Sequence, residues 1–535
     1  MSKGLGITDE AEKILIESGE DDRQHTVATE GHTAAATLRA LLQGVAVRSA
    51  FPESLQIRQV TCDSRKVQRS ALFVAIEGVA TDGNRYAREA VSQGAAAVLS
   101  ATSAPADWPG NVPWVQVGEP RKALAITAAN FYGRPADALK LVGVTGTNGK
   151  TTTTSLIDSI VRASGAQSGL FGTIGYRTPR GIYPAPNTTP ESADLQSFFA
   201  EIRDAGGSYA VMEASSHALA LDRLWGCHFA VGVFTNLTRD HIDFHKNFEN
   251  YFAAKRHLFE GTGTEVPDVA VINTDDPWGK KLVGLAKKTL TYGLNNGSDL
   301  KAKKFQLSFN GLNFAAQTPS GIIQVQSHLV GRINVYNILA AIGAGIGLGL
   351  SNEVIETGIR NLESVAGRFQ RIDQGQPFLV VVDYAHTDDA LENLIRTAHE
   401  LNPKARVITL FGCGGSRDRT KRPIMGETAG RLSDLSILTS DNPRQEDPLK
   451  IISDIVVGTQ KSGGKYLIEA DRARAIHLAI DEARPGDIVL LAGKGHEDYQ
   501  IFADRTIHFD DREEARKALR ERGYAEPPGG PKFGT

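Results

Sequence analysis

The sequence has little cysteine, no long apolar run and no surplus of charge of either sign. Its 535 residues include three cysteines, at positions 62, 227 and 413. Three are too few for a disulfide framework, and their wide spacing excludes a paired zinc-ligand motif. We therefore expect the chain to work in a reducing compartment.

Charge and hydropathy also argue against nucleic acids and membranes as partners of the protein. Lys and Arg number 59 against 62 Asp and Glu, a net charge of -3, which offers no electrostatic footprint for nucleic acid and no polybasic membrane anchor. No apolar run approaches the roughly 20 residues of a membrane span, and the acidic N-terminus lacks the order of a signal peptide. We expect a cytoplasmic protein whose partners are small molecules.

Apolar segments of strand length alternate with segments of helical periodicity, which predicts an α/β fold. A chain of this length exceeds one hydrophobic core. We expect an acidic extension over residues 1–36, followed by domains over residues 37–138, 139–366 and 367–535. The central domain contains the runs LVGVTG, YAVMEASS, VGVFTN and VAVINT, which predict a mostly parallel sheet, and the third contains FLVVVDYAH, RVITLFG, LSILTS and DIVLLAG.

A glycine-rich turn follows the first strand of the central domain and precedes a helix with one apolar face. Such a turn is typical of a P-loop, in which main-chain N–H groups hold phosphates, the lysine neutralises charge and a hydroxyl holds Mg²⁺. The predicted ATP-binding residues of this loop are Gly146, Thr147, Asn148, Gly149, Lys150, Thr151 and Thr152. The general pattern has glycine where this chain has Val144, and an ordinary strand-to-helix turn is the alternative.

Polar residues follow the next two predicted strands. Glu213 ends YAVME, and TNLTRDHIDFH carries His241. Because the carboxyl ends of parallel strands meet at one edge of a sheet, Glu213, His241 and Thr151 together indicate a Mg²⁺–nucleotide site. Taken singly, Glu213 is more typical of a solvated carboxylate and His241 of a structural histidine.

Nine motifs, read in order, resemble those of the Mur ligases, enzymes of bacterial cell-wall synthesis that use ATP to couple amino acids to a UDP-N-acetylmuramoyl peptide. They are GTNGKTTT, EASSHAL, TNLTRDHID, NVYNILAAI, GRF, DYAHT, GGSRDRTKRP, DNPR and GKGHE. The resemblance is closest to the members that add meso-diaminopimelate to UDP-N-acetylmuramoyl-L-alanyl-D-glutamate. It implies a UDP-binding N-terminal domain, a central P-loop ATPase domain and a Rossmann-like C-terminal domain that binds the amino acid, in a chain that we expect to be a monomer.

The resemblance also implies roles for single residues. The UDP substrate would contact Ser64, Asn187, Thr188, Thr189, Ser215 and Arg223. ATP would contact Asn337, Arg368, Asp383 and His386 besides the phosphate loop. Diaminopimelate would contact Arg417, Asp441, Asn442, Pro443, Arg444, Gly493 and Glu497. The family usually has Pro-Gly where this chain has Arg69-Ser70.

The family's reaction implies catalytic roles for Lys150, Lys255 and His241. A substrate carboxylate attacks the γ-phosphate of ATP, and the amine of the amino acid then attacks the acyl phosphate. Phosphoryl transfer of this kind depends more on charge neutralisation, here by Lys150 and Mg²⁺, than on covalent catalysis by the protein. By itself, Lys255 in FENYFAAKRHLFE is typical of a solvated lysine on a core-facing helix. The resemblance implies instead that CO₂ converts it to a carbamate, which can help to hold a second Mg²⁺ with His241, as an ammonium cannot.

The segment SDNPRQEDP predicts which amino acid is added. Lysine and meso-diaminopimelate differ by one distal carboxylate, for which Arg444 supplies a cation in a turn stiffened by Pro443. Alternatively, Arg444 pairs with Glu446 or Asp447 on a solvated loop. The remaining alternatives for the whole chain are an L-lysine-adding ligase, a folylpolyglutamate synthase and a P-loop ATPase that switches conformation to bind a partner.

Overall fold

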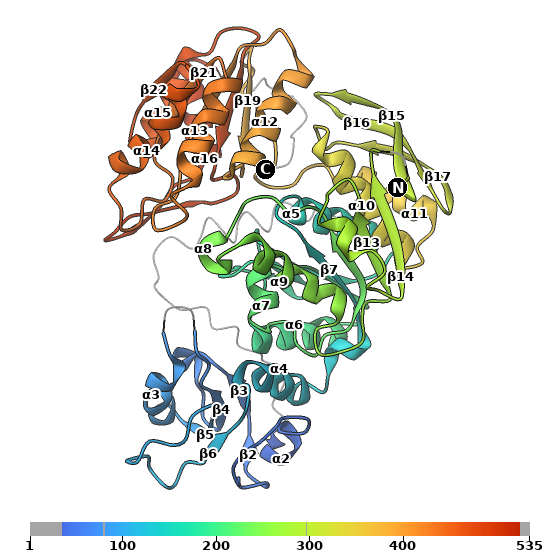
Figure 1. The fold of residues 1–535 in the computed structure, drawn as a ribbon, viewed down its shortest axis with the longest axis vertical. Coiled ribbons are helices and arrows are strands. Elements are labelled where there is room, and N and C mark those ends of the chain that lie inside the picture. Colours follow the sequence, from blue (N-terminus) through green and yellow to red (C-terminus); the bar gives the residue numbers. More distant parts are fainter. Residues whose placement is uncertain (1–34, 79–80, 296, 525–535) are drawn as a thin grey trace, which may run out of the picture.

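The structure is a computed structural model that describes residues 35–78, 81–295 and 297–524, so nearly all of the predicted acidic extension lies outside the described residues. Three bodies follow one another along the long axis of the molecule (Figure 1). Each is built on a sheet of its own, which confirms the predicted α/β class with three domains. The domain boundaries near residues 138 and 366 stay predictions.

The N-terminal body contains a four-stranded parallel sheet in the order β3-β4-β5-β6. Its apolar core reaches Ala193 and Ala200 of α6 in the central body, so the two bodies pack through helices α4 and α6 (Figure 1). The elements are β1 (Ala36–Thr37), α2 (Leu38–Leu41), β2 (Gln56–Ile57), β3 (Gln59–Thr61), η1 (Ser64–Lys66), β4 (Ala71–Val74), η2 (Gly83–Tyr86), α3 (Ala87–Ser92), β5 (Ala95–Ser100), β6 (Trp114–Gln116) and α4 (Pro120–Phe131).

The central body contains an eleven-stranded sheet in the order β10-β9-β8-β11-β7-β12-β13-β14-β15-β16-β17. Its strands run parallel from β8 to β15, as predicted, and the antiparallel strands lie at the two edges. Strands β7 (Lys140–Thr145), β11 (Tyr209–Glu213), β12 (Phe229–Phe234) and β13 (Val269–Asn273) were expected from the sequence. The others are β8 (Ser168–Phe171), β9 (Tyr176–Thr178), β10 (Gly181–Tyr183), β14 (Lys288–Gly293), β15 (Leu300–Ser308), β16 (Gly311–Thr318) and β17 (Gly321–Ser327).

Helices cover both faces of this sheet. One face is covered by α5, α10 and α11 and the other by α6 and α9. Helix α5 buries Leu156, Ile157, Ile160 and Val161 completely, which confirms the apolar face predicted for it. The helices are η3 (Pro135–Ala138), α5 (Lys150–Ala163), α6 (Ser192–Asp204), α7 (Ser216–Ala220), α8 (Ile242–His245), α9 (Phe248–Glu260), η4 (Gly279–Leu282), α10 (Ile333–Gly347) and α11 (Asn352–Asn361).

The C-terminal body contains a six-stranded sheet in the order β18-β19-β23-β20-β21-β22, parallel apart from β18. Helices α15 and α16 cover one face, and α12, α13 and α14 cover the other. The elements are β18 (Gln370–Ile372), β19 (Leu379–Asp383), α12 (Asp388–Leu401), β20 (Val407–Phe411), α13 (Lys421–Leu432), β21 (Leu435–Leu438), α14 (Pro448–Lys461), β22 (Tyr466–Ile468), α15 (Arg472–Glu482), β23 (Ile488–Ala492), β24 (Tyr499–Ile501), β25 (Thr506–His508) and α16 (Asp511–Glu521). Within the described ranges, no helix combines the length and apolarity needed to cross a membrane.

Candidate active site

The glycine-rich loop leaves β7 at the centre of the large sheet. β7 lies between β11 and β12, and Val144 is paired with Glu213, the last residue of β11. On the other side Thr145 is paired with Phe234, where β12 ends. The loop, Glu213 and the segment that leads to His241 therefore meet at one edge, as the parallel order requires.

Two glycines of the loop occupy positions that no other residue can take. Gly146 has a φ of 147°, and a Cβ there would lie 1.9 Å from Oγ1 of Thr235. Gly149 has a φ of 86°, and a Cβ there would lie 2.4 Å from Oδ1 of Asn337. By contrast, Val144 is a fully buried residue of β7. The tight loop thus begins at Gly146, which is why position 144 needs no glycine.

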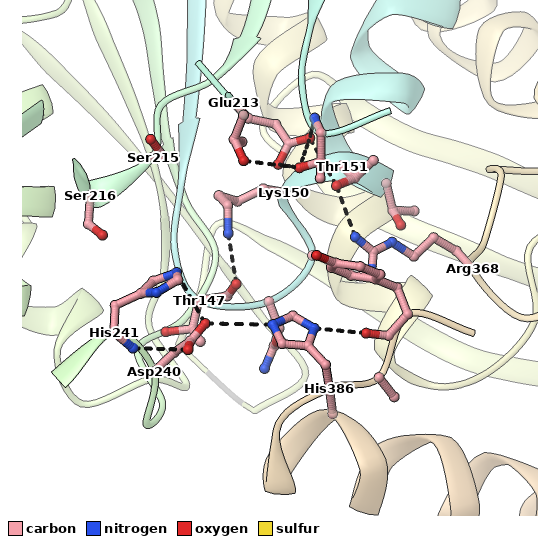
Figure 2. A pocket seen from close by; sticks show the side chains of 18 of the residues that line it. Thr147, Lys150, Thr151, Glu213, Ser215, Ser216, Asp240, His241, Arg368 and His386 are labelled. Carbon is pink, nitrogen blue, oxygen red and sulfur yellow. Dashed lines mark hydrogen bonds and ion pairs between the residues drawn. The ribbon is translucent and has the colours of Figure 1, made fainter. Parts of the chain in front are cut away.

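The loop opens into a cavity of about 710 Å³ between the central and C-terminal bodies. Figure 2 shows side chains of both bodies pointing into it. Of the predicted site residues, the lining includes Thr147, Asn148, Gly149, Lys150, Thr151, Thr152, Asn187, Thr188, Glu213, Ser215, Arg223, His241, Lys255, Asn337, Arg368, Asp383, His386 and Arg417. The structure therefore gathers residues from predicted nucleotide, metal, substrate and amino-acid sites around one cavity.

Thr151 and Glu213 form an oxygen-rich corner of this cavity. Oγ1 of Thr151 donates to Oε1 of Glu213 over 2.9 Å, and the Thr173 amide donates to the same oxygen over 2.9 Å. Glu213 is 1% exposed, so its interpretation as a solvated carboxylate is wrong. Arg368 of the C-terminal body donates to Oγ1 of Thr151 over 3.1 Å. A cation from the C-terminal body thus reaches the end of the phosphate loop.

The donor set at this corner suits magnesium. Mg²⁺ prefers hard oxygen ligands and commonly takes one or two protein groups together with water and substrate phosphates. The hydroxyl of Thr151 and the carboxylate of Glu213 are such ligands. The described part of the chain contains no group of three or more His, Cys, Asp or Glu side chains arranged to hold a metal, so a magnesium ion here would depend on water and phosphate for the rest of its coordination.

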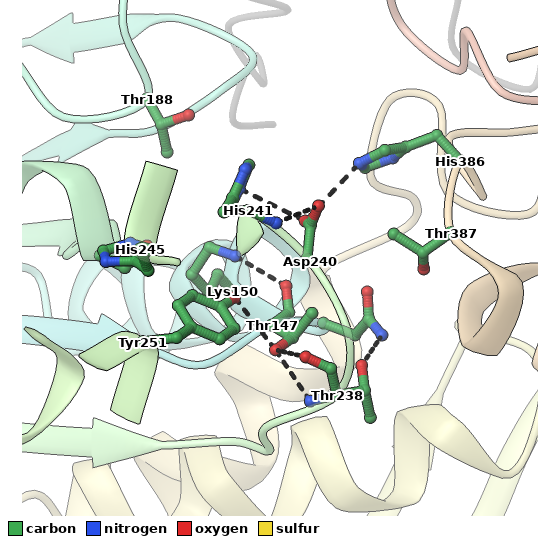
Figure 3. Close-up of polar contacts among 12 residues, drawn as sticks. Thr147, Lys150, Thr188, Thr238, Asp240, His241, His245, Tyr251, His386 and Thr387 are labelled. Carbon is green, nitrogen blue, oxygen red and sulfur yellow. Dashed lines mark hydrogen bonds and ion pairs between the residues drawn. The ribbon is translucent and has the colours of Figure 1, made fainter. Parts of the chain in front are cut away.

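Asp240 lines the cavity and is a site residue that the sequence patterns did not predict. Its Oδ2 lies 3.3 Å from Nε2 of His241 and 4.0 Å from Nε2 of His386 (Figure 3). Burial opposes ionisation of Asp240, but His241, His386 and Lys421 hold its pKa at about 2. The only sequence signal was its position in the motif TRDH, directly before His241.

His241 is held in an unusual backbone conformation beside Asp240. It has a φ of 53° and precedes the short helix α8, and its main-chain amide donates to Asp240 over 2.9 Å. Burial lowers the pKa of His241 to about 3, although Asp240 opposes this shift. His241 is therefore neutral near pH 7, the state in which an imidazole can bind a metal.

Two lysines converge on the loop from different helices. Nζ of Lys150 lies 3.1 Å from the Gly146 carbonyl oxygen and 2.8 Å from that of Thr147, and Nζ of Lys255 in α9 lies 2.7 Å from the Gly146 oxygen. Lys255 is 1% exposed, so the interpretation as a solvated lysine is wrong. Burial, followed by the charge of Lys150, lowers the pKa of Lys255 well below its usual value.

The predicted UDP-substrate residues are only partly brought together. Thr188 and Ser215 face the cavity, whereas Thr189 is fully buried and donates to the Glu213 carbonyl over 2.6 Å. Ser215 also caps α7. Ser64 is buried in η1 of the N-terminal body and does not line the cavity.

Arg223 points into the cavity from the loop after α7. Its Nε lies 3.1 Å from Oε2 of Glu191, and Nη1 donates to the Thr189 carbonyl over 3.0 Å. Glu191 in turn lies 3.7 Å from Arg121 of α4. Arg223 is therefore held by a carboxylate that also contacts the N-terminal body.

The predicted amino-acid residues lie on loops at the carboxyl end of the C-terminal sheet. A Cβ on Gly414 would lie 2.9 Å from Nη1 of Arg444 and 3.7 Å from Cγ of Arg417, so both arginines flank one turn. Pro443 lies beside Arg444 in this loop, and its carbonyl oxygen would be 1.8 Å from a Cβ on Gly415. The guanidinium of Arg444 donates to the Gly415 carbonyl over 3.1 Å.

The alternative interpretation of Arg444, an ion pair with Glu446 or Asp447 on a solvated loop, is wrong. Glu446 pairs instead with Arg422, with Oε1 2.8 Å from Nη2, and Asp447 caps α14 by accepting from the Leu449 amide. The distal guanidinium of Arg444 is therefore not neutralised by either acidic neighbour in the sequence.

A hydrogen bond joins Asn442, on the loop after β21, to Glu497, on the loop after β23. Nδ2 of Asn442 donates to Oε2 of Glu497 over 3.0 Å, and the fully buried Lys494 lies 3.2 Å from that oxygen. Gly493 has a φ of 114°, and a Cβ there would lie 3.1 Å from Oδ2 of Asp441. These contacts place Asp441, Asn442, Gly493 and Glu497 around one polar corner, which does not line the cavity at the phosphate loop.

Comparisons with known proteins point to one family. Three family profiles match, described as "Mur ligase family, catalytic domain" over residues 56–132, "Mur ligase middle domain" over residues 144–345 and "Mur ligase, glutamate ligase domain" over residues 367–495. A protein of Solibacter usitatus named UDP-N-acetylmuramoyl-L-alanyl-D-glutamate--2,6-diaminopimelate ligase is 51% identical over 480 residues, which are 89% of this chain and 97% of the relative.

Solved structures agree in fold. A structure of a ligase with the same name is 33% identical, with a TM-score of 0.64, and the match covers 92% of this chain and 100% of that one. The MurF ligase of Thermotoga maritima, solved with ADP, is 19% identical, with a TM-score of 0.61 over 87% of this chain and 98% of that one. At 19% identity, the similarity to this second structure is evidence for the fold alone.

Proposed function

The chain belongs to the Mur ligase family, and from this premise we propose that it uses ATP to join meso-diaminopimelate to UDP-N-acetylmuramoyl-L-alanyl-D-glutamate, forming ADP and phosphate. The Solibacter relative and the 33% identical solved structure both bear the name of this ligase. The observation that carries the choice of amino acid is Arg444, whose guanidinium flanks Gly414 beside Arg417 while its acidic sequence neighbours are engaged elsewhere.

ATP is proposed to bind with its phosphates at the glycine-rich loop. Lys150 would neutralise phosphate charge, and Arg368 would approach the same phosphates from the C-terminal body because it already reaches Thr151. Thr151 and Glu213 would hold the magnesium ion. When bound, this ion supplies further neutralisation of the phosphate charge. Asn337, Asp383 and His386, which line the same cavity, would contact the rest of the nucleotide.

The UDP substrate is proposed to present its terminal carboxylate to the γ-phosphate along the cavity wall formed by Thr188, Ser215 and Arg223. The carboxylate oxygen bonds to the γ-phosphorus, the bond to ADP breaks, and an acyl phosphate results. The amine nitrogen of diaminopimelate then attacks the acyl carbon, phosphate leaves, and the amine loses a proton as the amide forms. Arg223 suits the first step because a guanidinium orients a carboxylate through paired hydrogen bonds.

Lys255 is proposed to act as a carbamate. Two ammonium groups on one carbonyl oxygen repel each other in a buried setting, which favours the neutral amine of Lys255. The neutral amine can add CO₂ by forming an N–C bond and releasing a proton. The anionic product would lie beside Lys150 and supply oxygen ligands, together with His241, for a second magnesium ion.

The remaining assignments extend this proposal over the chain. Residues 37–138 would bind the uridine end through Ser64, residues 139–366 would bind ATP, and residues 367–535 would bind diaminopimelate through Arg417, Asp441, Asn442, Pro443, Arg444, Gly493 and Glu497. We propose that the protein acts as a monomer in the cytoplasm.

A coupled phosphate-release assay tests the proposed function. The protein should release phosphate from ATP only when UDP-N-acetylmuramoyl-L-alanyl-D-glutamate and meso-diaminopimelate are both present. Release of phosphate without an amino acid would favour an ATPase switch. Preference for L-lysine in a parallel assay would favour the lysine-adding ligase, and release that depends on a folate and glutamate would favour a folylpolyglutamate synthase.

A further inference from the structure

Arg422 is a fully buried cation behind the predicted amino-acid site. It lies in the first turn of α13 and is 0% exposed. Its Nη2 and Nη1 atoms lie 2.8 and 3.0 Å from the two carboxylate oxygens of Glu446, and Nη1 lies 2.9 Å from Oδ2 of Asp454. A guanidinium can be buried only where such partners compensate for lost water, so its place in the fold is tightly specified.

The Arg422–Glu446 pair joins two loops, which we call the β20 loop (residues 412–417) and the β21 loop (residues 439–446). Nη2 of Arg422 donates to the carbonyl oxygen of Gly414 in the β20 loop over 3.3 Å. Glu446, at the end of the β21 loop, accepts from the main-chain amide of Ser416 over 2.6 Å. Both members of the pair therefore hold the backbone of the β20 loop.

The two loops also contact each other directly. The Gly415 amide donates to the Asn442 carbonyl over 2.9 Å, and Arg444 donates to the Gly415 carbonyl over 3.1 Å. A Cβ on Gly415 would lie 1.8 Å from the Pro443 carbonyl oxygen. The backbones of the two loops are therefore in direct contact. Because of this contact, a shift of one loop would displace the other.

Each loop contains a strained residue next to a predicted amino-acid contact. Ser416 and Arg444 both have a φ of 53°, in the left-handed region that residues other than glycine adopt at a cost. Ser416 directly precedes Arg417. Strained residues of this kind persist only where neighbouring contacts hold them, and the hydrogen bond from the Ser416 amide to Glu446 is such a contact.

We propose that Arg422 and Glu446 are positioning residues for amino-acid selection: their ion pair locks the β20 and β21 loops together and so sets the direction of Arg417 and Arg444. The identity of the selected amino acid rests on the proposed function, whereas the locking of the two loops does not. Neither residue needs to touch the substrate, because each acts through the backbone that carries the two arginines.

Asp454 provides a matched control on the same guanidinium. It pairs with Arg422 at 2.9 Å but lies on α14, and its other partner among the described residues is Arg419. Glu446→Gln and Asp454→Asn each neutralise one carboxylate that pairs with Arg422 and leave the side chain nearly the same size. Only the first removes charge from the group that holds the Ser416 amide.

Steady-state kinetics with all three substrates gives the first test. Glu446→Gln should raise the KM for meso-diaminopimelate at least tenfold and leave the KM values for ATP and the UDP substrate within twofold. Glu446→Asp should recover part of the loss, and Asp454→Asn should stay within twofold for every substrate. An equal rise of all three KM values in Glu446→Gln, or an equal effect of Asp454→Asn, would overturn the proposal.

Hydrogen–deuterium exchange of the full chain without ligands gives a second test that needs no activity. Peptides covering residues 412–418 and 441–447 should exchange at least threefold faster in Glu446→Gln than in the wild type or in Asp454→Asn. Unchanged exchange in these peptides would overturn the proposal even where the kinetics differ. If the wild type fails to turn over diaminopimelate, the proposed function is wrong, while the exchange comparison still decides whether the pair locks the loops.

Discussion

Lys150 and Lys255 donate to the same atom, the carbonyl oxygen of Gly146, over 3.1 and 2.7 Å. The two lysines are 105 positions apart in the sequence, and both are enclosed by the fold, which lowers the pKa of each by burial. Repulsion between two ammonium groups this close together adds to the effect of burial and favours the neutral amine of Lys255. A neutral amine is the form that can add CO₂ to become a carbamate.

Replacement of Lys255 by alanine should abolish most of the activity. Because the carbamate would supply anionic oxygen ligands, we expect Lys255→Ala to lower kcat at least 100-fold in the coupled phosphate-release assay. Bicarbonate or a short carboxylic acid at high concentration should restore part of it, since either can place an anion in the space left by the side chain. Wild-type protein in ¹³C-bicarbonate should show a carbamate resonance that Lys255→Ala lacks; full activity of that variant would contradict the assignment.

Replacement of Arg444 should affect the amino acid and not the nucleotide. Loss of a charge-assisted pair costs about 2 kcal/mol or more, so Arg444→Ala should weaken use of meso-diaminopimelate by well over tenfold and leave the KM for ATP nearly unchanged. Arg505, exposed on the neighbouring β24–β25 hairpin, is the matched control, and Arg505→Ala should behave like the wild type. A wild type that prefers L-lysine would refute the specificity while leaving the ligase proposal intact.

Nucleotide and acceptor should draw the central and C-terminal bodies together. Asn148 of the phosphate loop donates to Asp389 of α12 over 2.7 Å, and Arg368 donates to Thr151, so ATP would bind at contacts that already bridge the bodies. Small-angle scattering should show a smaller radius of gyration with an ATP analogue and the UDP substrate. Arg368→Ala should reduce this change, unlike Arg256→Ala, which removes an exposed pair with Glu260 within α9; superimposable curves with and without ligands would count against closure.

Glu446 should make the stability of the protein depend on pH in the acid range. Hydrogen bonds from Arg422 and from the Ser416 amide lower the pKa of Glu446 from 4.5 to about 2. Since the folded-state pKa is depressed, the contribution is complete above about pH 4.5 and is lost as the pH falls towards 2. In urea unfolding followed by circular dichroism, the stability difference between the wild type and Glu446→Gln should shrink between these two pH values; a constant difference would contradict the shift.

Ser70 marks a turn where this chain departs from the family pattern. It has a φ of 66°, a conformation that glycine adopts without the steric cost that a Cβ incurs. Ser70→Gly should therefore stabilise the N-terminal body by about 0.5–1 kcal/mol, whereas Ser70→Ala should bring no gain. Scanning calorimetry would detect the change as a higher unfolding temperature of the transition that includes this body, and an equal effect of both substitutions would show that backbone strain is not the cause.

Local sequence patterns predicted the parts of the fold that depend on neighbouring residues. The apolar runs before Gly146, Ala214 and Thr235 form β7, β11 and β12, and the predicted helix FENYFAAKRHLFE coincides with α9. The strands β15, β16 and β17 were not predicted, although buried and exposed residues alternate along β16 and β17. Such alternation indicates a strand but does not identify its partner, because pairing depends on segments elsewhere in the chain.

Spacing along the backbone is enough to show which chemical groups the chain has and which of them follow a strand or begin a helix. How these groups interact could be read only from the folded chain: Lys255 is buried on the Gly146 carbonyl, Asp240 lies between His241 and His386, and Glu446 pairs with Arg422 instead of Arg444. Burial and electrostatic interaction depend on distances in space, which residue spacing does not give. Those distances are set by how the sheets and helices pack, and residues far apart in the chain contribute equally to them.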